Sequence, residues 1–191
     1  MGIILASESP RRSELLARMG LEFEVRTGEH DETMNLSADP SDEVARVSRL
    51  KVEAIYPHCH EDDVLIGADT IVVCDGLIMG KPRSEADAFS MLRRLSGRNH
   101  EVMTGLCVMK GDYVETTTVT TTLRFRHLSD EEIRAYIATG EPMDKAGGYA
   151  IQGLAAMFTV GIDGDYYNVM GLPVCTLSQI LRKLGIKLLG I

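Results

Sequence analysis

The sequence predicts an α/β fold built on a mixed β-sheet. Segments with helical periodicity alternate with Val- and Thr-rich segments along the 191 residues. Residues 101–125 are predicted to form a long two-stranded ribbon that turns at residues 110–112, which argues against a pure βαβ repeat. The length fits a single domain, residues 1–191, with two lobes.

The first half of the chain is predicted to alternate regularly between strands and helices. Ser9 is placed to cap the first helix, and Pro10 occupies its first turn, where a missing N–H costs nothing. Pro57 is expected to stop the second helix. The expected order is a strand at 3–6, a helix at 10–19, a strand at 22–25, a polar loop at 28–32, a helix from 40 to about 56, and a buried strand at 64–68.

The second half begins with a predicted hairpin, in which Asp75 and Gly76 form the turn. Residues 84–87 and 129–132 have the composition of helix starts. The glycine-rich stretch 145–171 is expected to consist of loops and short strands. The remaining expected elements are the hairpin at 71–79, helices from 84 to about 95 and from 129 to about 140, and a closing helix at 172–184.

Charge and composition exclude several classes of function. The net charge of −8 argues against a nucleic-acid or membrane-surface partner, because such partners need a basic face. No signal segment and no membrane-spanning apolar run is visible, so a cytoplasmic location is expected. The four cysteines lack C-x-x-C spacing, which predicts reduced and mostly buried thiols.

Residues 7–12 read Ser-Glu-Ser-Pro-Arg-Arg and join the first strand to the first helix. Arg11 and Arg12 lie where free backbone N–H groups and the helix dipole favour an anion. The junction therefore indicates a phosphate site. The alternative is a capped helix whose arginines are simply solvated.

Asp69 directly follows the buried strand at 64–68, with Gly67 and Ala68 leaving space around it. Carboxylates at strand ends in α/β folds line ligand crevices, where they bind metals or act as bases. The alternative is an Asp that caps the next turn. Lys81 lies between Gly80 and Pro82; the spacing does not fit a P-loop, but a rigidly presented lysine can contact phosphate.

Other polar residues complete a candidate inventory. Asp31 and Glu32 offer a second carboxylate for a metal, and Lys51 follows on the next helix, although both features are also typical of solvated surfaces. Gln152 ends a glycine-dense loop and has the donor and acceptor needed to read a base edge. Cations and carboxylates without a Ser-His-Asp or Cys-His set favour metal-assisted phosphoryl chemistry with water as the nucleophile.

The chain resembles the Maf proteins, which are nucleoside triphosphate pyrophosphatases related in fold to the inosine triphosphatases. The resemblance covers nearly the whole chain, in the right order. It implies a two-lobed mixed-sheet fold with a central cleft, hydrolysis of a nucleotide to the monophosphate and pyrophosphate, and a homodimer. It also implies a divalent metal cation, Mg²⁺ or else Mn²⁺ or Co²⁺. The matching motifs lie at residues 7–12, 67–70, 80–82, 95–97 with His100, 144–147, 151–153 and 171–173.

The resemblance also implies roles for individual residues. Asp69 corresponds to the acid that activates water, and Glu32 and Asp69 to metal ligands. The residues that correspond to triphosphate contacts are Ser7, Arg12, Lys51 and Lys81.

Three positions indicate the subfamily. Arg11, Thr70 and Gln152 match the dTTP/UTP type, whereas members resembling the 7-methyl-GTP type carry Trp, Gln and Glu there. A uracil or thymine edge presents acceptor, donor and acceptor, which an amide and a guanidinium can match.

The sequence therefore predicts a metal-dependent pyrophosphatase that acts on dTTP, UTP and modified pyrimidine nucleotides and clears non-canonical nucleotides. Two alternatives stay open. One is a pyrophosphatase for 7-methyl-GTP or purine nucleotides. The other is a regulatory protein of septum formation, a role with which the Maf name is associated.

Overall fold

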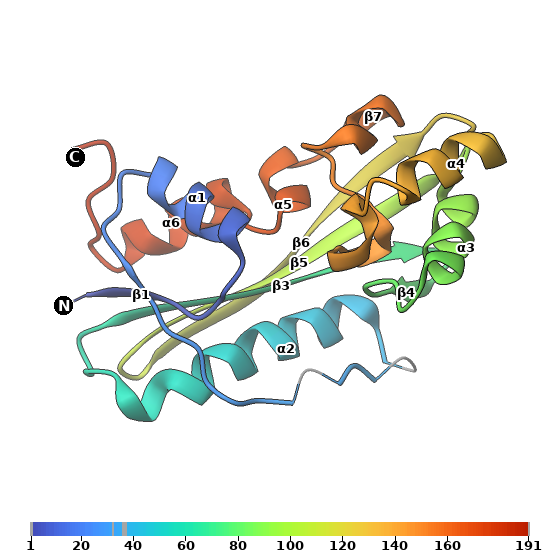
Figure 1. Ribbon diagram of the computed structural model, residues 1–191. Coiled ribbons are helices and arrows are strands. Elements are labelled where there is room, and N and C mark those ends of the chain that lie inside the picture. Colours follow the sequence, from blue (N-terminus) through green and yellow to red (C-terminus); the bar gives the residue numbers. More distant parts are fainter. Residues whose placement is uncertain (1, 32, 36–37, 191) are drawn as a thin grey trace. The chain divides into compact units, whose positions relative to one another are not determined.

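The computed structural model describes residues 2–31, 33–35 and 38–190, and its chain divides into two compact units (Figure 1). Unit 1 comprises Met1–Asp69, Thr104–Val119 and Gly171–Ile191, and unit 2 comprises Thr70–Met103 and Thr120–Met170. The predicted description of residues 1–191 as one domain with two lobes stays a prediction, as does the cleft.

The described strands form one mixed sheet in the order β2-β1-β3-β5-β6-β7, with β4 paired to β3. Strand β1 is parallel to β2 and β3, whereas β4 runs antiparallel to β3 and β7 antiparallel to β6. The predicted mixed α/β class is confirmed. The strands are β1 (Ile3–Leu5), β2 (Glu24–Val25), β3 (Val64–Cys74), β4 (Leu77–Met79), β5 (Asn99–Lys110), β6 (Tyr113–Phe125) and β7 (Thr159–Asp163).

The helices agree well with the predicted ones, except for α5, a short helix that the glycine-rich composition of its region concealed. They are α1 (Pro10–Arg18), α2 (Pro40–Ile55), α3 (Glu85–Leu95), α4 (Asp130–Ile137), α5 (Tyr166–Met170) and α6 (Val174–Lys183). Short 3₁₀ turns are η1 (Tyr56–His58), η2 (Glu141–Asp144), η3 (Ala146–Gly148) and η4 (Leu154–Met157).

Local polar contacts explain where several of these elements begin. The Ser84 hydroxyl accepts a hydrogen bond from the backbone N–H of Asp87, and Ser129 forms a reciprocal capping box with Glu132. Asp75 and Gly76 both have positive φ, as the tight turn between β3 and β4 requires. The predicted cap at Ser9 is wrong in part: Ser9 holds the cap position, but its side chain makes no capping hydrogen bond.

In unit 1, helices lie on both sides of the strands, with α2 on one face and α1 and α6 on the other (Figure 1). Apolar residues of β1, α2 and β3 form a buried cluster that includes Ile4, Val52 and Leu65. Such burial supplies the main favourable free energy of folding. The sheet in this unit therefore has two covered faces.

Unit 2 is organised around an aromatic core. Phe125 of β6 packs edge-to-face against Tyr149, with ring centroids 4.9 Å apart, and Tyr136 of α4 packs in the same way against Phe158 at 5.1 Å. Helices α3 and α4 pack against each other.

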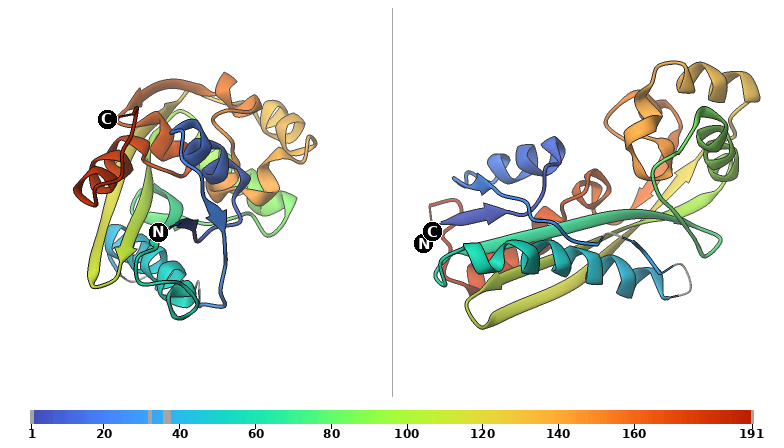
Figure 2. Two further views of the ribbon diagram at one scale, coloured as in Figure 1. Left: turned by 90° about the vertical axis from the view of Figure 1, so that its left-hand side faces the viewer. Right: turned by 60° about the horizontal axis from the view of Figure 1, so that its bottom comes forward.

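Figure 2 shows β5 and β6 side by side as a long ribbon, as predicted.

Strand β3 is longer than predicted and changes the setting of Asp69 and Thr70. Both residues were expected at the end of a strand, but β3 continues to Cys74 and places them in its interior. The reason is that residues 71–74 are as buried as residues 64–68, so that one strand spans both apolar runs.

Candidate functional site

Arg12 is fixed at the junction between β1 and α1. Its Nε donates a hydrogen bond to the carbonyl oxygen of Gly171 at 2.7 Å, and its Nη1 donates to the hydroxyl of Ser7 at 3.1 Å. Arg12 is 8% exposed and Ser7 5% exposed. The structure thus brings together two of the predicted phosphate-binding residues, in a geometry that only a planar guanidinium satisfies.

Arg11 differs from its neighbour. It is half-buried, and its side chain makes no hydrogen bond or ion pair with any residue in the described part of the chain. Its guanidinium is therefore available to a ligand, whereas that of Arg12 is oriented by the protein. This difference supports separate roles for the two arginines.

Asp69 and Lys51 form an ion pair between β3 and α2. Lys51 Nζ donates to Asp69 Oδ1 at 2.7 Å, and the two side chains are 9% and 16% exposed. The structure therefore brings the predicted catalytic carboxylate and a predicted phosphate contact together. One oxygen of the carboxylate, Oδ1, is therefore oriented by the ammonium group of Lys51.

Two glycines set the distance between α2 and the sheet in unit 1. A Cβ at Gly67 of β3 would lie 2.4 Å from the carbonyl oxygen of Ser48, and one at Gly105 of β5 would lie 2.3 Å from that of Val44. The expected open space at Gly67 is thus filled by a closely packed helix. This close approach lets Lys51 reach Asp69 across the interface between helix and strand.

The remaining described candidates belong to unit 2. Thr70 lies within β3, Lys81 follows β4, and Gln152 occupies a turn at residues 151–153. Lys81 and Gln152 are both exposed. Glu32, predicted to bind a metal, lies outside the described residues.

The loop that carries Gln152 is anchored within unit 2. The N–H of Gly147 donates to the carbonyl oxygen of Gly80, the neighbour of Lys81, at 3.0 Å. Gly147 has a φ of 68°, and a Cβ there would lie 2.8 Å from Val72. A glycine is therefore required where the loop crosses β3.

His100 also anchors this loop, a role that the sequence did not reveal. Its Nε2 lies 2.8 Å from the hydroxyl of Tyr149, and its ring packs edge-to-face on Phe125. Burial lowers the pKa of His100 from its ordinary value to about 4, so the ring is neutral at pH 7. In the sequence, His100 stands out only as part of a motif. Its contact with Tyr149 could not be predicted, because the two residues are 49 positions apart.

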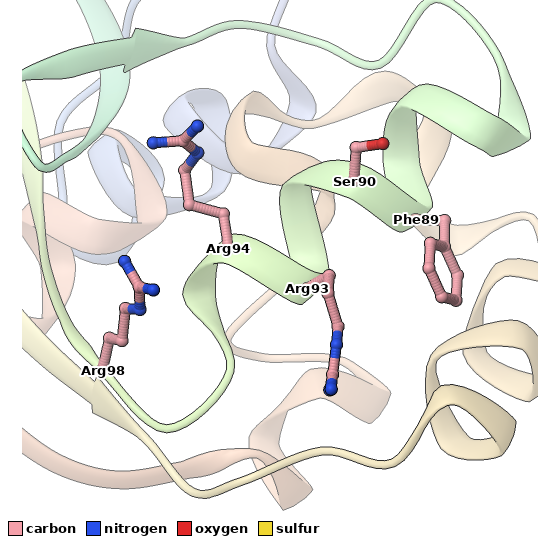
Figure 3. A pocket seen from close by; sticks show the side chains of 5 residues that line it. All are labelled: Phe89, Ser90, Arg93, Arg94 and Arg98. Atoms are coloured by element: carbon pink, nitrogen blue, oxygen red, sulfur yellow. The ribbon is translucent and has the colours of Figure 1, made fainter.

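A surface pocket of about 390 Å³ lies on α3 of unit 2 (Figure 3). Its arginines already have protein partners. Arg98 pairs with Asp75 at 2.7 Å, and Arg93 donates to the carbonyl oxygen of Leu128. The pocket is lined by Phe89, Ser90, Arg93, Arg94 and Arg98, and none of the predicted site residues is among them.

The described part of the chain offers neither a cluster of metal ligands nor a membrane-spanning helix. Among residues 2–31, 33–35 and 38–190, no three His, Cys, Asp or Glu side chains are grouped as a metal site. The described helices include none that is long and apolar enough to cross a membrane. The cysteines carry free thiols: Cys74 and Cys107 are buried, Cys59 is half-buried and Cys175 is exposed, so fewer are buried than expected.

Solved structures share the fold of this chain at low sequence identity. The Ham1 protein of Staphylococcus aureus aligns with a TM-score of 0.54 at 12% identity, covering 97% of this chain and 100% of that one. A HAM1 protein from Coxiella burnetii aligns with a TM-score of 0.51 at 11% identity, covering 96% and 99%. These similarities confirm the expected fold type.

Curated relatives are much closer in sequence. A protein of Geotalea uraniireducens named dTTP/UTP pyrophosphatase is 54% identical over 185 residues, which are 96% of this chain and 95% of that protein. Proteins of the same name from Geobacter sulfurreducens and Koribacter versatilis are 51% and 46% identical, covering 96% and 97% of this chain and 96% of each relative. The family model described as Maf-like protein matches residues 2–184. The chain therefore belongs to the Maf family.

Proposed function

We propose that this protein hydrolyses dTTP and UTP to the nucleoside monophosphate and pyrophosphate. The observation that carries the proposal is the identity of 42–54%, over nearly full length, to curated relatives named dTTP/UTP pyrophosphatase. The ion pair between Lys51 and Asp69 supports it, because it holds a carboxylate beside a cation in a mostly buried setting. We further propose that the protein clears modified pyrimidine nucleotides.

The proposed reaction uses water as the nucleophile. Asp69 accepts a proton from a water molecule whose oxygen attacks the α-phosphorus. The bond between the α-phosphorus and the bridging oxygen then breaks, and pyrophosphate leaves with that bond's electron pair. Positive side chains that neutralise the leaving group favour this step, because its charge grows as the bond breaks. The groups proposed for this task are Arg12, Lys51 and Lys81, with Ser7 holding Arg12 in place.

A divalent cation fits the donor chemistry at Asp69. Hard cations such as Mg²⁺ prefer carboxylate oxygens and complete their shell with water and substrate phosphates, so one or two carboxylates suffice. We propose Asp69 and Glu32 as the ligands. When bound, such a cation neutralises charge on the phosphate oxygens.

The pyrimidine preference is assigned to Arg11, Thr70 and Gln152. The exposed amide of Gln152 can donate one hydrogen bond and accept another, which matches the O4 and N3–H of uracil. Cytosine presents the opposite pattern at these two atoms. A homodimer and a cytoplasmic location complete the proposal.

Pyrophosphate release from a panel of triphosphates tests the proposal. The panel contains dTTP, UTP, CTP, 7-methyl-GTP and ITP, each with Mg²⁺, Mn²⁺ or Co²⁺. We expect kcat/KM to be highest for dTTP and UTP. A higher value for 7-methyl-GTP or ITP would contradict the pyrimidine assignment.

Two variants separate catalysis from selectivity. Asp69→Asn should abolish turnover, whereas Asp62→Asn, the same change in an exposed loop, should leave it intact. Arg11→Trp combined with Gln152→Glu should shift the preference away from pyrimidines. An active Asp69→Asn variant would remove Asp69 from the mechanism.

A further inference from the structure

The turn that carries Gln152 is held by hydrogen bonds on both sides. Two positions before it, the N–H of Ala150 donates to the hydroxyl oxygen of Tyr136 at 3.2 Å. Two positions after it, the N–H of Leu154 donates to Glu141 Oε2 at 3.1 Å. The backbone on either side of Gln152 is therefore tied to the segment that ends α4 and follows it.

These two attachments are joined to each other. The hydroxyl of Tyr136 donates a hydrogen bond of 2.8 Å to Glu141 Oε1, so Glu141 accepts from Tyr136 and Leu154 at once. Tyr136 is 4% exposed, and burial, followed by the bond to Glu141, raises the pKa of its phenol. The phenol thus stays protonated and remains a donor at neutral pH.

Gly153 leaves the space that Glu141 occupies. A Cβ at position 153 would lie 2.5 Å from each carboxylate oxygen of Glu141, a distance that real Cβ atoms do not tolerate. The residue next to Gln152 is therefore packed directly against the Glu141 carboxylate. Any larger side chain at position 153 would displace that carboxylate and its hydrogen bonds.

We propose that Glu141 is a positioning residue that sets nucleobase selectivity, by fixing the turn from which Gln152 reads the base. The inference rests on the proposed function. An amide distinguishes uracil from cytosine only if its oxygen and nitrogen are held in register with the base edge. A fixed backbone restricts the rotamers with which the amide can reach the base edge, whereas a mobile turn lets the amide approach either base in the orientation that suits it.

The test compares Glu141→Ala with Glu131→Ala, which changes an exposed glutamate on α4 whose side chain makes no hydrogen bond with a described residue. The readout is the ratio of kcat/KM for UTP to that for CTP. We expect Glu141→Ala to lower this ratio about tenfold, the value of one net hydrogen bond. In Glu141→Ala, the KM for UTP should rise while the kcat changes little. Glu131→Ala should change neither the ratio nor the KM.

Conservative variants keep the test informative if Glu141→Ala folds poorly. Glu141→Gln retains one oxygen for the N–H of Leu154 and should give an intermediate ratio. Gly153→Ala should lower the ratio in the wild-type chain, but should add nothing to Glu141→Ala. Equal effects of Gly153→Ala in both backgrounds would contradict contact between the two positions.

Gln152→Ala distinguishes failure of the inference from failure of the proposed function. We expect it to lower the UTP preference, and the double variant with Glu141→Ala to be no less selective than Gln152→Ala alone. If Gln152→Ala lowers the ratio and Glu141→Ala does not, the inference about Glu141 is overturned. If Gln152→Ala has no effect, Gln152 does not read the base, and the inference falls with that assignment.

Discussion

Lys51 Nζ lies 2.7 Å from Asp69 Oδ1, and this contact links helix α2 to the strand that it covers. Both side chains are mostly buried, at 9% and 16% exposure. Removing one partner of such a pair leaves the other charge poorly solvated, which costs more than the pair itself contributes. We therefore expect substitutions at either residue to lower stability as well as the proposed activity.

Lys51→Met should destabilise the fold and lower activity together. We expect the free energy of unfolding to fall by about 1–3 kcal/mol, because the carboxylate of Asp69 loses a hydrogen-bond donor. Urea titration measures this change, and pyrophosphate release should show a parallel loss in kcat/KM. The control is Lys187→Met, at an exposed lysine of the C-terminal segment, which should change neither quantity. Equal unfolding midpoints for wild type and Lys51→Met would contradict a structural role for the pair.

Arg12→Lys should be far more damaging than Arg11→Lys. A lysine at position 12 cannot reproduce the hydrogen bonds to both Gly171 and Ser7, so about 1–3 kcal/mol of stability should be lost. The side chain at position 11 makes no such hydrogen bonds, so Arg11→Lys should change the free energy of unfolding by no more than about 0.5 kcal/mol. Chemical denaturation of the two variants checks this, and similar losses in both would refute the distinction.

Gly67→Ala and Gly105→Ala should each lower the melting temperature. In both variants the new methyl group meets a backbone carbonyl of α2 at less than 2.5 Å, and the helix must move outward. Overpacking of this kind costs about 1–3 kcal/mol. Gly80→Ala is the matched control, because no described atom outside its chain neighbours lies within 4 Å of a Cβ there. Thermal unfolding followed by circular dichroism measures the melting temperatures. Similar values for all three variants would contradict close packing of α2 on the sheet at Gly67 and Gly105.

His100 should make stability depend on pH in the acid range. Its folded pKa of about 4 lies below the ordinary value of 6.5, so the unfolded chain takes up a proton first as the pH falls. The stability due to neutral His100 is therefore complete above about pH 6.5 and is lost progressively towards pH 4.

His100→Gln removes this titration. The stability difference between wild type and His100→Gln should shrink by about 2 kcal/mol from pH 8 to pH 5. His127→Gln, at an exposed histidine, should show no such trend. Denaturant titrations at pH 8 and pH 5 measure the free energy of unfolding of each variant. A difference that does not change with pH would mean that His100 is not held neutral.

Local signals made much of the fold predictable. The capping box at Ser129 and Glu132 and the turn at Asp75 and Gly76 depend on neighbouring residues, and both were expected from the sequence. The extent of β3 was not predictable in this way, because Asp69 interrupts the apolar pattern and the pattern then predicts a strand that ends before it. The strand continues because residues 71–74 are as buried as residues 64–68 and because Val72–Cys74 pair with β4.

Motifs in the sequence identify candidate site residues one by one, but they do not predict the contacts that support them. Motifs identified Arg12, Lys51 and Asp69, whereas the bonds that orient them join positions far apart in the sequence. The bond from Arg12 to Gly171 spans 159 positions, and Lys51 reaches Asp69 over 18. Glu141 gave no signal at all, since an exposed-looking glutamate before a proline is common in turns.

The interleaving of the two units has a genetic consequence. Unit 1 is assembled from three stretches of chain and unit 2 from two, and three of the boundaries fall inside β3, β5 and β6. No single stop codon, cut or gene fusion can yield either unit alone as a continuous polypeptide. Asp69 ends one stretch and Thr70 begins the next, so the proposed acid and a proposed base-selecting residue are inherited as neighbouring codons. Recombination between related genes would exchange both together far more often than it would separate them.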